Sequence, residues 1–199
     1  MTVNKDVPTF PLHTVIMPGG KLELQIFEQR YLEMIKQCLK EQRSFLVVLI
    51  KSGAEVGDTP DIYSSGVLVT IVDFYQLKNG LLGIQIQAAE KVRIETTSIA
   101  AGGLMLAETD ALAPEIDVVL PDEYFELAEL LRQLIMHPSI DKLHLLIDYE
   151  SAVCVSSRLV EWLPLEREVK QELFELTDPL SRLERIDEEV QRMQGYLDA

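Results

Sequence analysis

Cysteine is scarce in this 199-residue sequence, which contains only Cys38 and Cys154. Two cysteines cannot build the disulfide framework of a small secreted domain or a four-thiolate zinc site. Both lie within apolar helical patterns, so we expect two buried free thiols. Long apolar runs are absent as well, because the longest, residues 45–50, is far short of the ~18 residues that a membrane span needs.

Glycine-rich phosphate loops are also missing. The sequence contains neither G-x-x-x-x-G-K-[ST] nor a G-x-G-x-x-G that follows a strand, which argues against ATP hydrolysis and dinucleotide binding. A serine nucleophile needs a base within hydrogen-bond reach, and no motif in the sequence indicates such a pair. We therefore expect no enzymatic activity and no cofactor.

Positive charge is in short supply, with 18 Lys and Arg against 33 Asp and Glu. The deficit lies in the C-terminal part, because residues 1–114 hold 13 acidic and 10 basic side chains whereas residues 115–199 hold 20 and 8. Such a surface repels phosphates, so we expect no nucleic-acid partner. The first twenty residues lack a basic start followed by an apolar stretch, which favours a cytoplasmic protein without membrane association.

The N-terminal part alternates between apolar and polar residues, as half-buried strands do. After the turn signal Pro18-Gly19-Gly20 a strand is expected over 22–26, followed by a helix near 28–42 whose buried stripe includes Tyr31 and Leu39. Further strands are expected at 45–50, from Gly66 to about 75, at 82–86, at 92–96 and at 104–108. Lys78-Asn79-Gly80 predicts a hairpin in which Asn79 and Gly80 tolerate positive φ. About six strands with one inserted helix indicate a bent or closed sheet.

From about residue 119 the spacing becomes helical. Stripes of apolar residues predict a helix from about 121 that ends at Pro138, a second including 152–162, a third around 169–176, and a fourth capped by Asp178-Pro179. The fold class is therefore α+β, with a β-barrel subdomain at 1–118 and a helical subdomain of about four helices at 119–199. The stripe on the last helix is also compatible with a homodimer.

One group of potential metal ligands has helical spacing, namely His137, Asp141, His144 and Asp148. Pro138 interrupts any continuous helix across it, so we expect no metal site. His137 is then a cation near a helix C-terminus, and we expect His144 to be a loop or early-helix residue that is able to pair with Asp148.

The order of motifs resembles the N-terminal, substrate-binding domain of Lon proteases, including free-standing relatives. The resemblance rests on F-P-L at 10–12, V-I-M-P-G at 15–19, L-E-L-Q-I-F at 22–27, E-x-R-Y at 28–31, and near the end K-Q-x-L-x-E at 170–175 with R-L at 182–183. Gln29 stands where the family often has proline, and Ala88 and Lys91 replace the glycine and first arginine of its G-x-x-R-F-R-I motif. The resemblance implies a PUA-like barrel and binding of unfolded polypeptide.

For a non-catalytic domain of this kind, acting in substrate recognition or as an adaptor, we expect a peptide-binding surface that includes Met17, Pro18, Gly19, Phe27, Tyr31 and Tyr63. The residue 51–65 loop, rich in Gly, Pro and Ser, borders it. The alternative is a small-molecule-binding or enzymatic role in a crevice between barrel and helices, which would need convergent polar groups in a concave site.

Overall fold

The computed structural model of the protein describes residues 3–57 and 59–197. The chain divides into two compact units, Met1–Ala113 and Pro114–Ala199. The sequence places the boundary at 118/119. The division falls a few residues earlier because Glu115 and Asp117 bond to side chains and backbone of the second unit.

The first unit is a β-sheet of six strands with one helix inserted after the second strand. Strand β3 is buried along residues 45–50, as its continuous apolar run predicts for a central strand. The elements are β1 (Val3–Leu12), β2 (Lys21–Ile26), α1 (Gln29–Glu41), β3 (Phe45–Ser52), β4 (Asp61–Gln76), β5 (Leu82–Ile99) and β6 (Met105–Ala111).

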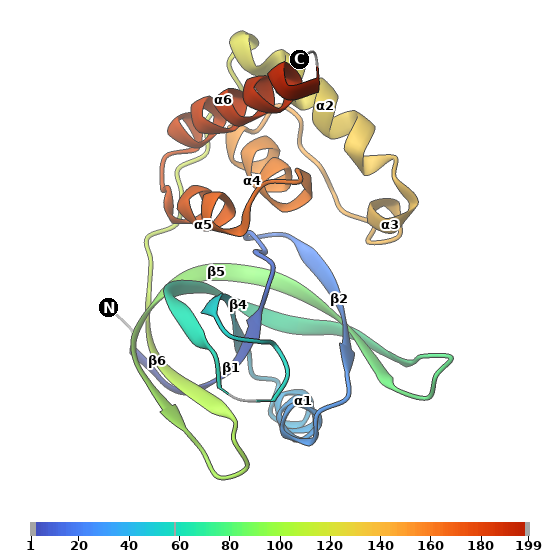
Figure 1. The fold of residues 1–199 in the computed structure, drawn as a ribbon, viewed down its shortest axis with the longest axis vertical. Coiled ribbons are helices and arrows are strands. Elements are labelled where there is room, and N and C mark those ends of the chain that lie inside the picture. Colours follow the sequence, from blue (N-terminus) through green and yellow to red (C-terminus); the bar gives the residue numbers. More distant parts are fainter. Residues whose placement is uncertain (1–2, 58, 198–199) are drawn as a thin grey trace. The chain divides into compact units, whose positions relative to one another are not determined.

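Pairing between β5 and β6 closes the sheet. The strand order is β2-β5-β4-β3-β1-β6, so β1, β3, β4, β5 and β6 form a ring, and β2 pairs with the first part of β5. Strand β1 runs parallel to β3 and antiparallel to β6, while the remaining neighbours are antiparallel. Figure 1 shows β5 curving through the unit. The closed α+β architecture agrees with the sequence expectation.

Two local expectations for the sheet were wrong. Strand β4 begins at Asp61 rather than Gly66, and the expected strands at 82–86 and 92–96 are parts of one strand, β5. Bulges in the β4–β5 ladder let the two strands stay paired through the bend. The expected hairpin joins these two strands, and within it Gly80 has positive φ whereas Asn79 does not.

Helix α1 buries one side against the sheet. Tyr31, Met34, Ile35 and Cys38 are buried, as their spacing predicts, whereas Leu39 is exposed and lies at the edge of the stripe. Cys38 and Cys154 are both free thiols. Burial raises the pKa of each.

The second unit is helical. Its helix α4 packs against α2, α5 and α6, so it forms the centre of the bundle. The pattern-based helices are present with small shifts at the ends, and none of the described helices is both long and apolar enough to cross a membrane. The elements are η1 (Asp122–Tyr124), α2 (Phe125–Ile135), α3 (Pro138–Asp141), α4 (Ala152–Trp162), α5 (Arg167–Glu175) and α6 (Pro179–Leu197).

The single turn α3 was not expected. Its N-cap is His137, whose Nδ1 accepts a hydrogen bond from the Ser139 N–H at 3.3 Å. His137 therefore serves as the N-cap of α3, a role that the sequence did not indicate. His144 is exposed and has positive φ in the segment that follows.

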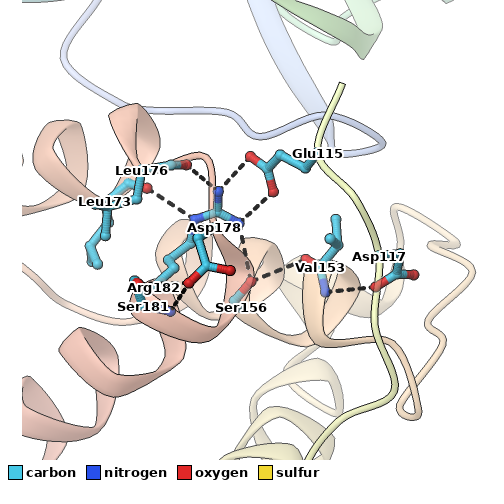
Figure 2. A network of polar contacts seen from close by, with 9 residues as sticks. All are labelled: Glu115, Asp117, Val153, Ser156, Leu173, Leu176, Asp178, Ser181 and Arg182. Atoms are coloured by element: carbon cyan, nitrogen blue, oxygen red, sulfur yellow. Dashed lines mark hydrogen bonds and ion pairs between the residues drawn. The ribbon is translucent and has the colours of Figure 1, made fainter. Parts of the chain in front are cut away.

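A buried arginine organises the polar contacts of the helical unit (Figure 2). Arg182 on α6 has no exposed surface, and both Nη atoms bond to the Glu115 carboxylate. This bidentate geometry explains why arginine rather than lysine occupies the position. The remaining acceptors of its guanidinium are the Leu173 carbonyl at 3.0 Å, the Ser156 Oγ at 3.2 Å and the Leu176 carbonyl.

Two further caps fix the helix starts. Ser151 accepts from the Cys154 N–H at 2.9 Å as the N-cap of α4 and donates to Asp117 at 2.6 Å. At α6, the Asp178 carboxylate accepts from the Ser181 N–H at 2.9 Å, which confirms the expected cap. The segment that enters the helical unit is therefore bonded at both Glu115 and Asp117.

Candidate functional site

The turn that precedes β2 is built from core residues and two glycines. The Met17 side chain is 0% exposed, so it packs in the core, whereas Pro18 is half-buried and Gly19 is exposed. Gly19 has a φ of +78°, and its N–H donates to the Ala88 carbonyl at 2.9 Å. Of the predicted binding residues in this turn, Pro18 and Gly19 are the ones that a ligand can reach.

The other end of β2 leads into α1 and exposes an aromatic side chain. Phe27 is 51% exposed, directly before Glu28, the N-cap residue of α1. Tyr31 is buried, with its ring centroid 4.1 Å from that of Phe10. Burial raises the pKa of the Tyr31 phenol, and the neighbouring Arg30 charge opposes that rise. Tyr31 therefore belongs to the core, and a ligand can reach Phe27 but not Tyr31.

Arg30 connects α1 to the β5–β6 turn. Its Nη1 donates to the Gly103 carbonyl at 3.1 Å, its Nη2 lies 3.0 Å from the Glu28 carboxylate, and its guanidinium lies 4.7 Å from the centre of the Tyr31 ring. The side chains of this pair are 11% and 19% exposed, so solvent screens the pair only in part. The start of α1 is thus held in place by charge as well as by packing.

The loop between β3 and β4 lies against the same end of the unit. The Glu55 carboxylate accepts from the His13 N–H, and the Gly57 N–H lies 3.5 Å from Glu28 Oε2. Val56, which is 53% exposed, directly precedes Gly57 just as Phe27 precedes Glu28. The Glu28–Gly57 contact therefore holds the loop that carries Val56 against the start of α1, directly after Phe27.

We call the surface formed by Phe27, Glu28, Glu55 and Val56 the Phe27 face. It combines two half-exposed apolar side chains with two carboxylates, on a loop and a helix start that are bonded to each other. Tyr63 is half-buried at the base of the loop, two residues after Asp61, which bonds to Ser52. The sequence did not single out Val56, although a lone valine in a loop of small and polar residues was an available signal.

The structure does not gather all the predicted binding residues in one place. Phe27 and Tyr31 lie at the end of β2 that leads into α1, whereas Met17, Pro18 and Gly19 lie at its beginning. Six residues of strand separate the two groups by about 20 Å. A short apolar segment bound at one end would not contact the other end.

Each unit carries a small depression on its surface. In the barrel unit a depression of about 330 Å³ lies between α1 and β4, lined by Cys38, Leu39, Gln42, Arg43, Thr70 and Ile71. In the part of the chain that the structure describes, no three His, Cys, Asp or Glu side chains gather as they would around a metal ion.

A closed sheet with one helix inserted after β2, followed by a small helical bundle, defines an α+β class of two-unit proteins. Comparison with family models identifies a particular family within this class. Residues 6–192 match the ATP-dependent protease La (LON) substrate-binding domain. Because the match spans nearly the whole chain, the protein belongs to the Lon substrate-binding domain family.

Solved structures agree with this membership. A Lon N-terminal domain protein from Xanthomonas campestris is 30% identical, with a TM-score of 0.74 over 94% of this chain and 97% of that one. The N-terminal domain of the Mycobacterium avium complex Lon protease shares the fold at 16% identity, with a TM-score of 0.61 over 92% and 96% of the two chains. Comparison with curated proteins finds no match.

Proposed function

We propose that the protein is a non-catalytic recognition domain, in substrate selection or as an adaptor, and that its barrel unit binds apolar segments of unfolded polypeptides at the Phe27 face. The observation that carries the proposal is the match to the Lon substrate-binding domain over residues 6–192. The exposed Phe27 and Val56 supply the matching surface chemistry.

The physical case rests on partial exposure in a fixed frame. Phe27 and Val56 each leave about half of their surface in water, so a bound apolar side chain gains contact area on both. The Glu28, Arg30 and Glu55 contacts hold the frame in place before binding, which lowers the entropy lost on association. Polar edges around an apolar centre are typical of protein-binding surfaces.

The direct test is fluorescence anisotropy with labelled unfolded peptides that are rich in Leu and Phe and carry no net charge. Burying the exposed half of a phenylalanine contributes about 1 kcal/mol, so Phe27→Ala should weaken binding about fivefold, and Val56→Ser somewhat less. Both side chains are half-exposed, and their replacement should leave the fold intact.

Matched controls exist on the same unit. Phe74 is 59% exposed on β4 and Val72 lies two residues before it, so Phe74→Ala and Val72→Ser remove the same atoms elsewhere. Their affinities should stay within twofold of the unmodified protein. Absence of saturable binding up to tens of micromolar, or a larger loss in Phe74→Ala than in Phe27→Ala, would contradict the proposal.

A further inference from the structure

The helical unit carries a groove that the barrel site does not use. Helices α2 and α6 both rest on α4, and a depression of about 340 Å³ lies between them. Its lining runs from Phe125 to Gln133 on α2 and from Asp187 to Gln194 on α6. Each stretch of eight or nine residues is about 13 Å long, so the groove extends over two helical turns.

The groove has an apolar floor. Leu127 and Val190 are buried at its base and Leu130 is half-buried, while Phe125 at one end is 61% exposed. Because α2 and α6 both pack against α4, a further helix can pack into the groove between them, with its ridges of side chains filling the gaps between theirs. An amphipathic helix that lays its apolar stripe into such a groove is a recurring mode of recognition.

Charge determines which kind of helix fits. The lining includes three carboxylates, Glu126, Glu129 and Asp187, and no Lys or Arg. Arg132 donates to Glu129 at 2.9 Å and so neutralises that carboxylate in part. Asp187 instead accepts a hydrogen bond from the neutral Gln191 side chain at 2.6 Å and so keeps its negative charge uncompensated by this partner. Beside the groove, burial and then the charges of Glu123, Glu184, Asp187 and Asp178 raise the pKa of Tyr124, which is consistent with a negative field there.

We infer that the α2–α6 groove binds a short amphipathic helix of a partner protein that presents leucine-like side chains along one stripe and Lys or Arg beside it. The net excess of acidic residues in 115–199 attracts the basic side chains of such a segment, and the apolar floor of the groove binds its leucine-like stripe. A second copy of the helical unit carries the same charge and is repelled. This site is separate from the Phe27 face and does not depend on the function proposed for it.

The probe is a fluorescein-labelled 14-residue peptide of Leu and Lys with helical amphipathic spacing, titrated into the full chain at physiological ionic strength. Two further peptides separate the contributions: a scrambled Leu/Lys peptide keeps the charge without the stripe, and a Leu/Glu peptide keeps the stripe with the opposite charge. The amphipathic Leu/Lys peptide should bind at least tenfold more tightly than either.

Variants locate the site. Glu126→Gln with Asp187→Asn removes two charges from the groove and should weaken binding about tenfold. The matched control is Glu168→Gln with Glu172→Gln on α5, which removes one first-turn and one mid-helix carboxylate outside the groove and should change the affinity less than twofold. Phe125→Ala should weaken binding about fivefold, because it removes an exposed anchor without changing charge.

Several outcomes would overturn the inference. If the groove variants and the control variants lose the same affinity, the peptide is attracted by net charge alone. If the scrambled peptide binds as tightly as the amphipathic one, the groove does not recognise an apolar stripe. Phe27→Ala should leave the affinity for the Leu/Lys peptide unchanged. If Phe27→Ala lowers it while Phe125→Ala does not, the basic helix binds the barrel instead. Loss of uncharged-peptide binding in Phe27→Ala bears only on the proposed function.

Discussion

Different interactions stabilise the interior of each of the two units. In the barrel unit, backbone pairing runs continuously around β1, β3, β4, β5 and β6, and apolar side chains such as Leu46 and Val92 fill the interior. In the helical unit, buried polar side chains connect the helices, with Arg182 bonded to α4, α5 and the entering segment. The barrel distributes its stability over many bonds, whereas the helical unit concentrates part of it in one guanidinium.

The largest expected effect is therefore on the helical unit. Arg182→Met removes the guanidinium that donates to the Glu115 carboxylate and to the Leu173 and Leu176 carbonyls, which should cost about 3–5 kcal/mol of unfolding free energy. Urea denaturation followed by the fluorescence of Trp162 reports on this unit, since the sequence has one tryptophan and it lies on α4.

Arg167→Met, at an exposed position on α5, is the control and should cost less than 1 kcal/mol. If the two arginine variants unfold at similar urea concentrations, the buried network does not hold the helices together and the contrast between the units fails.

The stability of the barrel should be most sensitive to a larger side chain at Gly66, where the backbones of β3 and β4 lie close together. A Cβ at Gly66 would lie 2.5 Å from the Val47 carbonyl oxygen, within the paired region of β3 and β4. Gly66→Ala should destabilise the barrel by about 1–3 kcal/mol because rigid backbone has to move.

Gly195→Ala in α6 offers the opposite case, since no atom lies within 4 Å of its added Cβ and alanine favours helix. That variant should be neutral or slightly more stable by thermal unfolding. A stable Gly66→Ala barrel would show that the β3–β4 ladder adjusts more freely than the geometry implies.

A smaller effect is expected from the cap of α4. Ser151→Ala removes both the bond from the Cys154 N–H and the bond to Asp117, which should cost about 1–2 kcal/mol of unfolding free energy, measured by Trp162 fluorescence. Ser139→Ala, at an exposed position on α3 of the same unit, should change it by less than about 0.5 kcal/mol, as surface substitutions usually do. If the two variants have the same unfolding midpoint, the Ser151 hydrogen bonds do not stabilise the helical unit.

The smallest effect depends on pH. Hydrogen bonds from Ser181 lower the pKa of Asp178 from its ordinary value of 3.8, so folding favours the charged carboxylate. Its stabilisation is present above the unfolded-state pKa and is lost as pH falls through the folded-state pKa.

The melting temperature of the helical unit should accordingly be higher than that of Asp178→Ala at pH 6, and the difference should shrink below about pH 4. A difference that stays constant down to pH 2 would show that the cap does not depend on the carboxylate charge.

Local patterns predicted much of the fold. The strand at 22–26, the buried apolar run of β3 and the Asp178-Pro179 cap each depend on neighbours in sequence, and the structure confirms them. The motif order further predicted the family. Strand ends were less predictable, because the start of β4 at Asp61 depends on pairing with β3 rather than on its own residues.

Contacts between distant residues could not be predicted. Glu115 and Arg182 are 67 positions apart, and neither has a local pattern that distinguishes it from a solvated charge. The same holds for the Phe27 face, where Gly57 meets Glu28 across 29 positions. Sequence patterns therefore indicated the exposed Phe27 but not its neighbour Val56, and they grouped it with the turn at Pro18-Gly19 from which the length of β2 separates it.

The central claim is that apolar polypeptide binds the barrel unit at the Phe27 face. Mapping backbone amide chemical shifts during titration with an uncharged Leu/Phe-rich peptide tests it most directly. The account predicts that the largest shifts occur at Phe27–Tyr31 and at Glu55–Gly57, with little change in the helical unit. Shifts confined to the β4–β5 hairpin or to α2 and α6 would contradict it.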